Sequence, residues 1–137
     1  MKLVTYSVKK DPFVGAVIAD DKIVVDLAAA DKALARKEKR PANPFFGDMI
    51  SLLEAGSKGI SAAKKAAKAA EARLGKNPVA NGKTSHLMSK VRLCAPVPNP
   101  KKVFCLAGNY QDHIEEGGGK MAVQDKETPR VFMKPPS

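Results

Sequence analysis

The sequence predicts an α+β protein, in which a small N-terminal α/β domain with a hairpin and two helices precedes the first strands of a second domain. β-Branched runs around a polar turn are typical of a hairpin, and an alanine- and lysine-rich stretch is typical of a helix. Three prolines within residues 96–100 mark a stiff connector. We therefore expect an N-terminal accessory domain at 1–95, a proline-rich connector at 96–101 and the incomplete start of a second domain at 102–137.

The first elements are predicted to be strands. Residues 3–8 alternate moderately between apolar and polar side chains, which is typical of a strand. Residues 13–27 hold two β-branched runs around Asp20 and Asp21, and this pattern predicts a hairpin. The charged stretch at 28–44 ends in prolines and predicts either a short helix or a solvated loop.

Two helices are predicted next. Within residues 46–56, Asp48 is placed to cap a short helix and Gly56 to end it. The side chains of this helix that we expect to face the core are Ile50, Leu53 and Met49. Residues 58–75 form the clearest helix signal, with Gly75 at its C-terminal cap. Its apolar stripe comprises Ile60, Ala63, Ala67, Ala70 and Leu74, and the lysines that stand off this stripe are Lys64, Lys65 and Lys68.

The C-terminal part of the chain alternates strands and loops. The apolar run at 102–108 predicts a buried strand, in which Cys105 is expected to be a small buried hydrophobic residue. Residues 109–116 predict one or two helical turns capped by Asn109, and residues 130–137 begin another strand. Because that strand stops at Pro-Pro-Ser, we expect the chain to be truncated.

Composition narrows the classes of protein. No apolar run approaches the roughly 18 to 20 residues of a membrane span, and the N-terminus lacks the apolar region of a signal peptide. The two cysteines, Cys94 and Cys105, lack CxxC spacing, so they are expected to be reduced thiols rather than metal ligands. We therefore expect a cytoplasmic protein without a membrane partner. His86 lies among polar residues and is expected to be exposed.

The net charge of +10 raises an alternative function. The lysine-rich helix at 58–76 could grip a phosphate backbone, as a basic nucleic-acid-binding module would. However, no aromatic side chains interleave its lysines for base stacking, and its alanine face carries a core stripe. A solvated helix face is the favoured interpretation, so nucleic acid is not the expected partner.

One short motif carries candidate catalytic chemistry. His113 and Glu116 are three residues apart, so a helical turn places both on one face. The carboxylate could accept a hydrogen bond from one imidazole nitrogen and raise the basicity of the other nitrogen. Glycines at 117–119 would let the segment close over a substrate. The same spacing is common on solvated helices, and spacing alone favours that interpretation.

Other polar residues near this motif are less informative. Lys134 follows an apolar strand, where a lysine can clamp a carboxylate or can simply be solvated. The acidic side chains of the region form no recognisable ligand cage for a hard cation, so no metal ligand is assigned. They are Asp112, Glu115, Glu116 and Asp125.

These residues resemble a known family. The run "APVPNPKKVFCLAGNYQDHIEE", followed after a glycine-rich loop by "PRVFMKPPS", resembles the start of the catalytic domain of the fumarylacetoacetate hydrolase (FAH) family. The N-terminal "MKLVTY", "VGAVIADDKIVVDLAAA" and "MISLLEAG" are similar to the small accessory domain of bacterial members. The resemblance is more specific over residues 95–137 than over the first 95 residues.

The resemblance implies a mixed-β catalytic domain, a homodimer and a divalent cation such as Mg²⁺ or Mn²⁺. It implies a hydrolase, lyase or isomerase acting on small 2-oxo or 2,4-dioxo acids, by carbon–carbon hydrolysis, decarboxylation or isomerisation. His113 and Glu116 would be a catalytic dyad on a lid, and Lys134 would contact the substrate. Asn109 and Tyr110 would shape the turn and help to bind the substrate.

The sequence departs from the family pattern in two places. Many members place an arginine, lysine or leucine after glycine just before Asn-Tyr, whereas this chain has Ala107 and Gly108. An arginine there would help to hold a substrate, so the resemblance does not fix the substrate class. The metal-binding carboxylates of the family lie downstream of the Lys-Pro-Pro-Ser segment. We therefore expect this chain to be an inactive fragment of the enzyme, or a gene product that has lost its site.

Overall fold

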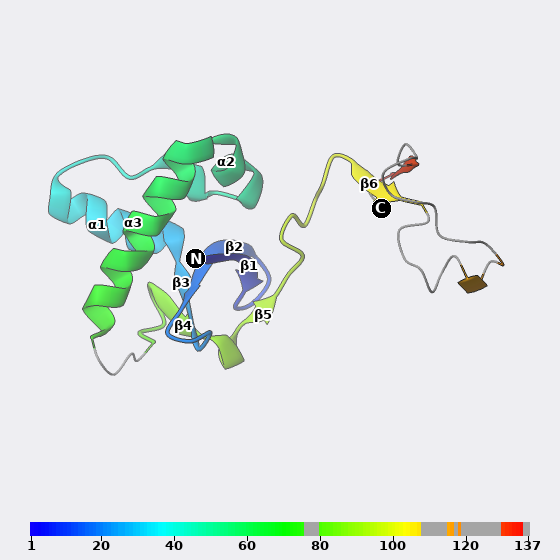
Figure 1. The fold of residues 1–137 in the computed structure, drawn as a ribbon. Helices are drawn as coiled ribbons and strands as arrows, with labels where there is room; N and C mark the ends of the chain where they lie inside the picture. The colour runs from blue at the N-terminus through cyan, green and yellow to red at the C-terminus, as the bar shows by residue number, and fades with distance from the viewer. Residues whose placement is uncertain (76–79, 108–114, 117, 119–129, 136–137) are drawn as a thin grey trace. The chain divides into compact units, whose positions relative to one another are not determined.

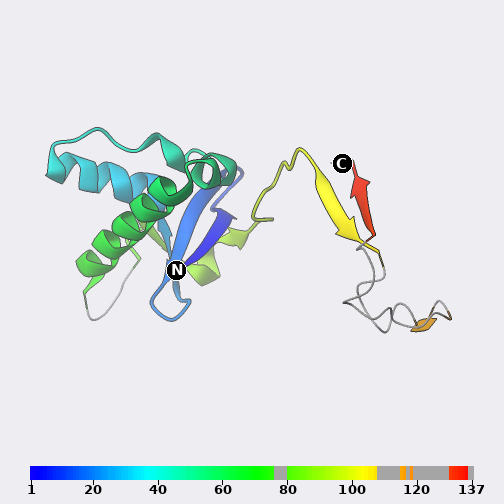
Figure 2. The ribbon, with the colours of Figure 1, turned by 45° about the horizontal axis from the view of Figure 1, so that its top comes forward.

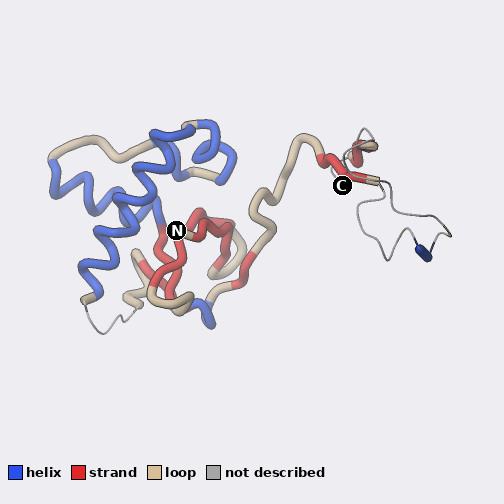
Figure 3. The backbone as a smooth tube through the Cα atoms, viewed as in Figure 1, coloured by secondary structure: helices blue, strands red, loops and turns tan. Residues whose placement is uncertain are grey.

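The computed structural model describes residues 1–75, 80–107, 115–116, 118 and 130–135. The chain divides into two compact units, Met1–Pro98 and Asn99–Ser137. The division falls inside the proline-rich segment. The first unit combines a curled antiparallel sheet with helices, and the second contains a pair of antiparallel strands (Figures 1 and 3). The predicted α+β fold class is confirmed.

The sheet of the first unit has five antiparallel strands in the order β4-β3-β2-β1-β5. Their bounds are β1 (Lys2–Ser7), β2 (Pro12–Ile18), β3 (Ile23–Asp26), β4 (Ser85–Leu87) and β5 (Arg92–Leu93). The predicted hairpin is confirmed as β2 and β3, with Ala19, Asp20 and Asp21 all at positive φ in its turn. Aspartate tolerates this left-handed backbone better than most residues, which explains why the polar pair marks the turn.

Three α-helices gather on one side of this sheet (Figure 2). They are α1 (Leu27–Glu38), α2 (Met49–Glu54) and α3 (Gly56–Leu74), and the short 3₁₀ turns are η1 (Pro44–Phe46) and η2 (Met88–Lys90). The charged stretch after β3 is therefore a helix rather than a loop. The side chain of Asp26 caps α1 by accepting a hydrogen bond from the amide of Ala29 at 2.8 Å.

The N-cap predicted for α2 is confirmed, and its predicted core face is right for Met49 but wrong for Leu53 and only partly right for Ile50. Asp48 accepts hydrogen bonds from the amide and hydroxyl of Ser51 at 2.8 and 3.0 Å. Met49 and Leu52 are buried, whereas Leu53 is 53% exposed and Ile50 is only half-buried. The reason is the close approach of α3, where a Cβ at Gly59 would lie 2.4 Å from the carbonyl oxygen of Leu52. Contact with α3 thus turns Leu52 inward instead of Leu53.

The second helix is confirmed as α3, which ends before Gly75 at φ +65°. Its buried stripe contains Ala63, Ala67 and Ala70 as predicted, with Ala66 and Gly59 added, while Ile60 and Leu74 are half-buried. These small side chains let α3 pack closely on α1 and β2. Among the helices of the described residues, none is long and apolar enough to cross a membrane.

The other face of the sheet holds a second packed group around Tyr6. Tyr6 is fully buried, and its ring centroid lies 5.8 Å from that of Phe13 and 5.7 Å from that of His86. The prediction that His86 is exposed is therefore wrong. The strand β4, which the sequence did not predict, pairs His86 with Val24 and so turns the imidazole toward Tyr6.

The start of the connector is anchored to the first unit. The hydroxyl of Thr5 donates to the carbonyl of Pro96 at 2.6 Å, and the amide of Cys94 donates to the carbonyl of Thr5 at 2.9 Å. The side chain of Val97 packs against the hydrophobic core. The prolines therefore begin as part of the folded unit.

Candidate functional site

The candidate site of the second unit is built on an antiparallel ladder of two strands, β6 (Val103–Leu106) and β7 (Val131–Lys134). Both strands were predicted, but the expectation that the first of them is buried is wrong, since Phe104 and Leu106 are 66% and 51% exposed. The register pairs Val103 with Lys134 at one end and Leu106 with Val131 at the other. The amide of Ala107 donates to the carbonyl of Arg130 at 2.9 Å, which extends the ladder by one more pair.

This register sorts the side chains onto two faces, because directly paired residues share a face and successive residues alternate. One face is wholly apolar and consists of Phe104, Leu106, Val131 and Met133, each 51 to 66% exposed. The other face carries Lys134 together with Val103, Cys105 and Phe132. Cys105 is half-buried rather than buried as predicted, since the described residues of this unit form a sheet of two strands.

Lys134 and the segment that leads to the predicted dyad leave the ladder at opposite ends. The chain leaves β6 after Leu106 and returns at Val131, whereas Lys134 lies opposite Val103. Three residues of strand, about 10 Å, separate Lys134 from that end.

Only part of the predicted dyad lies within the described residues. Asn109, Tyr110 and His113 lie outside them. Glu116 is described and, like Glu115, has helical backbone. The amide of Gly118 donates to the carbonyl of Glu115 at 2.9 Å, and Gly118 has φ +73°. A glycine in this conformation is typical of a helix end.

The described residues do not provide a metal site. Within residues 1–75, 80–107 and the described part of the remainder, no group of three or more histidine, cysteine, aspartate or glutamate side chains could hold an ion. A hard cation such as Mg²⁺ is bound mainly by carboxylate and carbonyl oxygens. The predicted Mg²⁺ or Mn²⁺ therefore finds no ligand set in this part of the chain.

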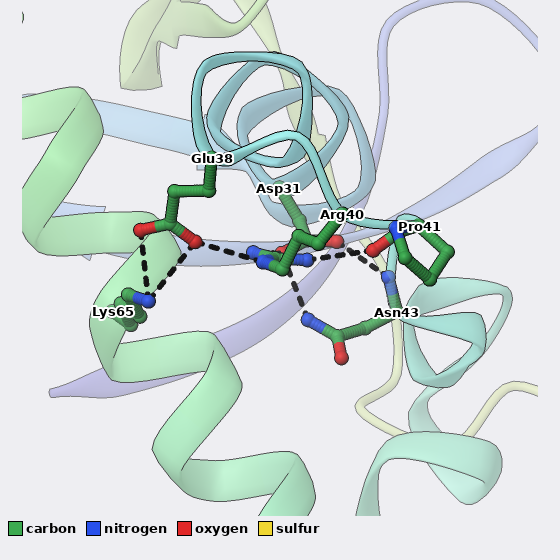
Figure 4. A network of polar contacts seen from close by, with 6 residues as sticks. All are labelled: Asp31, Glu38, Arg40, Pro41, Asn43 and Lys65. Carbon is green, nitrogen blue, oxygen red and sulfur yellow. Dashed lines mark hydrogen bonds and ion pairs between the residues drawn. The ribbon is translucent and has the colours of Figure 1, made fainter.

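The basic helix proposed as a nucleic-acid module uses its alanine face for packing and turns its lysines outward. Lys58, Lys64 and Lys68 are exposed, and Lys65 forms an ion pair with Glu38 of α1 at 2.8 Å (Figure 4). This ion pair joins α3 to α1, so Lys65 has a structural role. This arrangement fits the favoured interpretation of α3 as a solvated helix face.

Glu38 is part of a polar network that the sequence did not predict (Figure 4). The carboxylate of Asp31, only 1% exposed, accepts hydrogen bonds from Arg40 Nη2 at 2.7 Å and from the amide and side chain of Asn43 at 2.6 and 2.8 Å. Arg40 Nε also donates to Glu38 at 2.8 Å. Among the described residues, every buried polar side-chain atom has a hydrogen-bond partner, so the network is satisfied and structural.

The sequence alone did not single out Arg130, a cationic residue that directly precedes β7. Arg130 precedes Lys134 by four residues in an extended run, so the two share a strand face. The alternation of "RVFMK" indicates that Arg130 and Lys134 share a face. Which side chains of β6 lie on that face is known only from the register of the two strands.

Comparison with known proteins shows that the chain is similar in sequence to an enzyme. No protein-family model matches the chain. It is 34% identical to oxaloacetate tautomerase YisK of Bacillus subtilis, over an alignment that covers 99% of this chain. It spans 42% of the length of that protein. The similarity therefore covers both units of this chain and less than half of the relative.

Proposed function

We propose that this chain is the N-terminal part of a longer enzyme of the fumarylacetoacetate hydrolase family that acts on a 2-oxo or 2,4-dioxo acid. The observation that carries the proposal is the 34% identity to an oxaloacetate tautomerase along 99% of the chain. Among the reactions implied by the family resemblance, the relative favours keto–enol tautomerisation over carbon–carbon hydrolysis and decarboxylation. The expected substrate is accordingly a small oxo acid.

The geometry of the second unit supports this proposal. The apolar face of the β6–β7 ladder suits packing against further polypeptide, since a two-stranded sheet alone is marginally stable. The opposite face presents Lys134, whose ammonium can pair with a substrate carboxylate. The two faces thus divide the ladder into a packing side and a binding side.

His113 and Glu116 would perform the proton transfer. His113 takes a proton from the carbon next to the oxo group, and the electron pair of that C–H bond forms the carbon–carbon double bond of the enol. The imidazolium of His113 gives this proton to the oxo oxygen, which completes the enol and returns the imidazole to its neutral form, and the reverse steps restore the ketone without gain or loss of atoms. Glu116 would orient the imidazole and stabilise its protonated form.

The family resemblance adds a divalent cation, Mg²⁺ or Mn²⁺, which would polarise the oxo group when bound. Because the described residues hold no ligand set, its ligands would come from polypeptide beyond them. The chain alone is accordingly proposed to be inactive. A homodimer, which the resemblance implies, and a cytoplasmic location, which fits the reduced thiols expected for Cys94 and Cys105, complete the proposal.

The proposal is tested by assaying the full-length parent and the 137-residue chain side by side. Oxaloacetate and an acylpyruvate are supplied with Mg²⁺, and loss of the enol is followed by its ultraviolet absorbance. We expect turnover by the parent and none by the chain. A parent that turns over neither substrate would refute the family assignment, and turnover by the chain would refute its inactivity.

The dyad is tested by three variants of the parent. His113→Asn and Glu116→Gln are expected to lower kcat by about 100-fold or more, as loss of a general base does. The matched control is His86→Asn, which removes the other histidine and lies in the first unit. Wild-type kcat in His113→Asn, or an equal loss in His86→Asn, would refute the assignment of the base.

A further inference from the structure

We propose that the Asn81–Gly82 peptide is a modification site, at which Asn81 deamidates spontaneously to aspartate and isoaspartate, and that the folded turn before β4 restrains this reaction. The inference concerns the first unit and does not rest on the proposed function. It links the chemical ageing of the chain to the local stability of β4, because the reaction requires the turn to open.

The reaction needs only water as a co-reactant. The backbone nitrogen of Gly82 attacks the side-chain carbonyl carbon of Asn81, a new C–N bond forms, and the bond to Nδ2 breaks. Ammonia leaves with the proton that the Gly82 amide gives up, and a cyclic succinimide remains. Water then opens the ring, which yields aspartate when the new C–N bond breaks and isoaspartate when the original peptide bond breaks.

The sequence directs this reaction to Asn81. The chain has five asparagines, of which three precede proline. They are Asn43, Asn77 and Asn99. Proline has no N–H, so its nitrogen cannot form the succinimide. Asn109 precedes the bulky Tyr110, whereas Asn81 precedes a glycine, whose lack of a Cβ leaves its nitrogen unobstructed.

Hydrogen bonds hold both reacting groups of this peptide in the folded chain. Asn81 Oδ1 accepts from the amides of Lys83 and Thr84 at 2.8 Å each and from the amide of Ser85 at 3.3 Å. Asn81 Nδ2 donates to Thr84 Oγ1 at 2.9 Å. The amide of Gly82, whose proton must be lost, donates to the carbonyl of Ser85 at 2.9 Å. The two groups therefore react only after these bonds break.

The turn lies where local opening costs little. Asn81, Gly82 and Lys83 are exposed, and a Cβ at Gly82 would meet no atom within 4 Å. The strand that follows, β4, has three residues and lies at an edge of the sheet. Exposed segments with few packed contacts open at a fraction of the global free energy of unfolding. The rate of deamidation is therefore set by this local opening.

Isoaspartate would remove what holds the turn together. The backbone would then run through the former side chain of Asn81, so the hydrogen bonds to Oδ1 would be lost. The amide of Asp26 donates to the carbonyl of Thr84 at 3.0 Å, and His86 packs against Tyr6, so loosening of the turn reaches the core. A chain with isoaspartate at position 81 should accordingly unfold at a lower temperature than a fresh chain.

The test incubates the 137-residue chain at mildly alkaline pH, with and without urea. Peptide mapping by mass spectrometry follows the conversion of each asparagine, and an isoaspartyl methyltransferase quantifies isoaspartate. We expect urea to speed conversion of Asn81 about 10-fold or more, because it breaks several hydrogen bonds that restrain the reaction. In the same urea sample, Asn81 should react faster than Asn109.

Two variants of Thr84 test the role of the turn in native buffer. Thr84→Val removes the hydroxyl that accepts from Asn81 Nδ2 and should speed deamidation about 5-fold, as expected for the loss of one hydrogen bond. The matched control, Thr84→Ser, keeps the hydroxyl and should stay within about 2-fold of wild type. Thermal unfolding followed by circular dichroism verifies that both variants are folded.

The inference is overturned if urea does not speed conversion of Asn81, if Asn109 reacts as fast as Asn81 in urea, or if Thr84→Val reacts no faster than Thr84→Ser. An unchanged thermal midpoint in the chain that carries isoaspartate would overturn the proposed effect on β4. The comparison with urea uses the wild-type chain, so it decides the matter even if a variant fails to fold.

Discussion

Replacing Asp31 with asparagine should destabilise the first unit strongly, because this buried carboxylate joins α1 to the loop that follows it. Its oxygens accept hydrogen bonds from Arg40 and twice from Asn43 at 2.6 to 2.8 Å. Asparagine keeps one acceptor oxygen but loses the charge and the second acceptor. A hydrogen bond to a charged group contributes about 1.5–3 kcal/mol, and removing one partner of a buried pair costs about 3–5 kcal/mol.

Arg40 remains partly solvated, so we expect a loss of about 2–4 kcal/mol in the free energy of unfolding. At ~4–8 °C per kcal/mol for a unit of this size, the midpoint of thermal unfolding should fall by about 8 °C or more. The assays are urea and thermal denaturation of the 137-residue chain followed by circular dichroism. The control, Lys65→Gln, removes only the exposed ion pair with Glu38 and should leave the midpoint unchanged within error. Equal stability of Asp31→Asn and wild type would refute this account of the network.

Three further predictions concern the first unit, and each is measured by denaturation. A Cβ at Gly15 would lie 2.6 Å from Val24 Cγ1 and 2.9 Å from Tyr6 Cε1, so Gly15→Ala should cost about 1–3 kcal/mol. Gly47→Ala, with no atom within 4 Å of the added Cβ and helical backbone, should be neutral or slightly stabilising; equal losses in the two variants would contradict the packing argument. Tyr6→Phe removes the buried hydrogen bond to Asp26 at 3.2 Å and should cost about 1–2 kcal/mol, whereas wild-type stability would show that this bond contributes nothing. Burial of the Asp31 carboxyl opposes its ionisation, but the hydrogen bonds from Arg40 and Asn43 outweigh this and hold its pKa below the ordinary 3.8. Its stabilisation is therefore fully present above about pH 4 and is lost as the pH falls through the folded pKa, so the difference between wild type and Asp31→Asn should shrink in acid; a constant difference would contradict this sign.

The elements that the sequence predicted well are those fixed by local chemistry. The hairpin at β2 and β3 follows from two β-branched runs and an aspartate turn. The bounds of α3 follow from alanine content and a terminal glycine, and the start of α2 follows from the Asp48 cap. Each signal lies within a few residues of the structure that it specifies.

The elements that escaped prediction depend on partners distant in the chain. β4 is a three-residue strand in a polar segment, and it forms because β3 offers an edge, as the bond from the amide of Asp26 to Thr84 also shows. Leu52 rather than Leu53 is buried because Gly59 lets α3 approach α2. The burial of Asp31 requires Arg40 and Asn43, which only the folded loop brings to it.

In the candidate site, too, the sequence predicted the local features but not those that depend on residues distant in the chain. The sequence predicted β6 and β7 as strands and singled out Lys134, because apolar runs and a terminal lysine are local features. It did not predict which side chains share a face, since the register depends on pairing between strands far apart in the chain. For that reason Arg130 emerged only from the structure.

The most direct test of the central claim is hydrogen exchange at the carbon next to the oxo group, followed by proton NMR of the oxo acid in D₂O. The full-length parent should speed deuterium incorporation at that carbon well above the uncatalysed rate, and His113→Asn should abolish the acceleration while His86→Asn preserves it. Incorporation at the uncatalysed rate in the presence of the wild-type parent, or undiminished acceleration by His113→Asn, would contradict the claim that this chain carries the base of an oxo-acid enzyme.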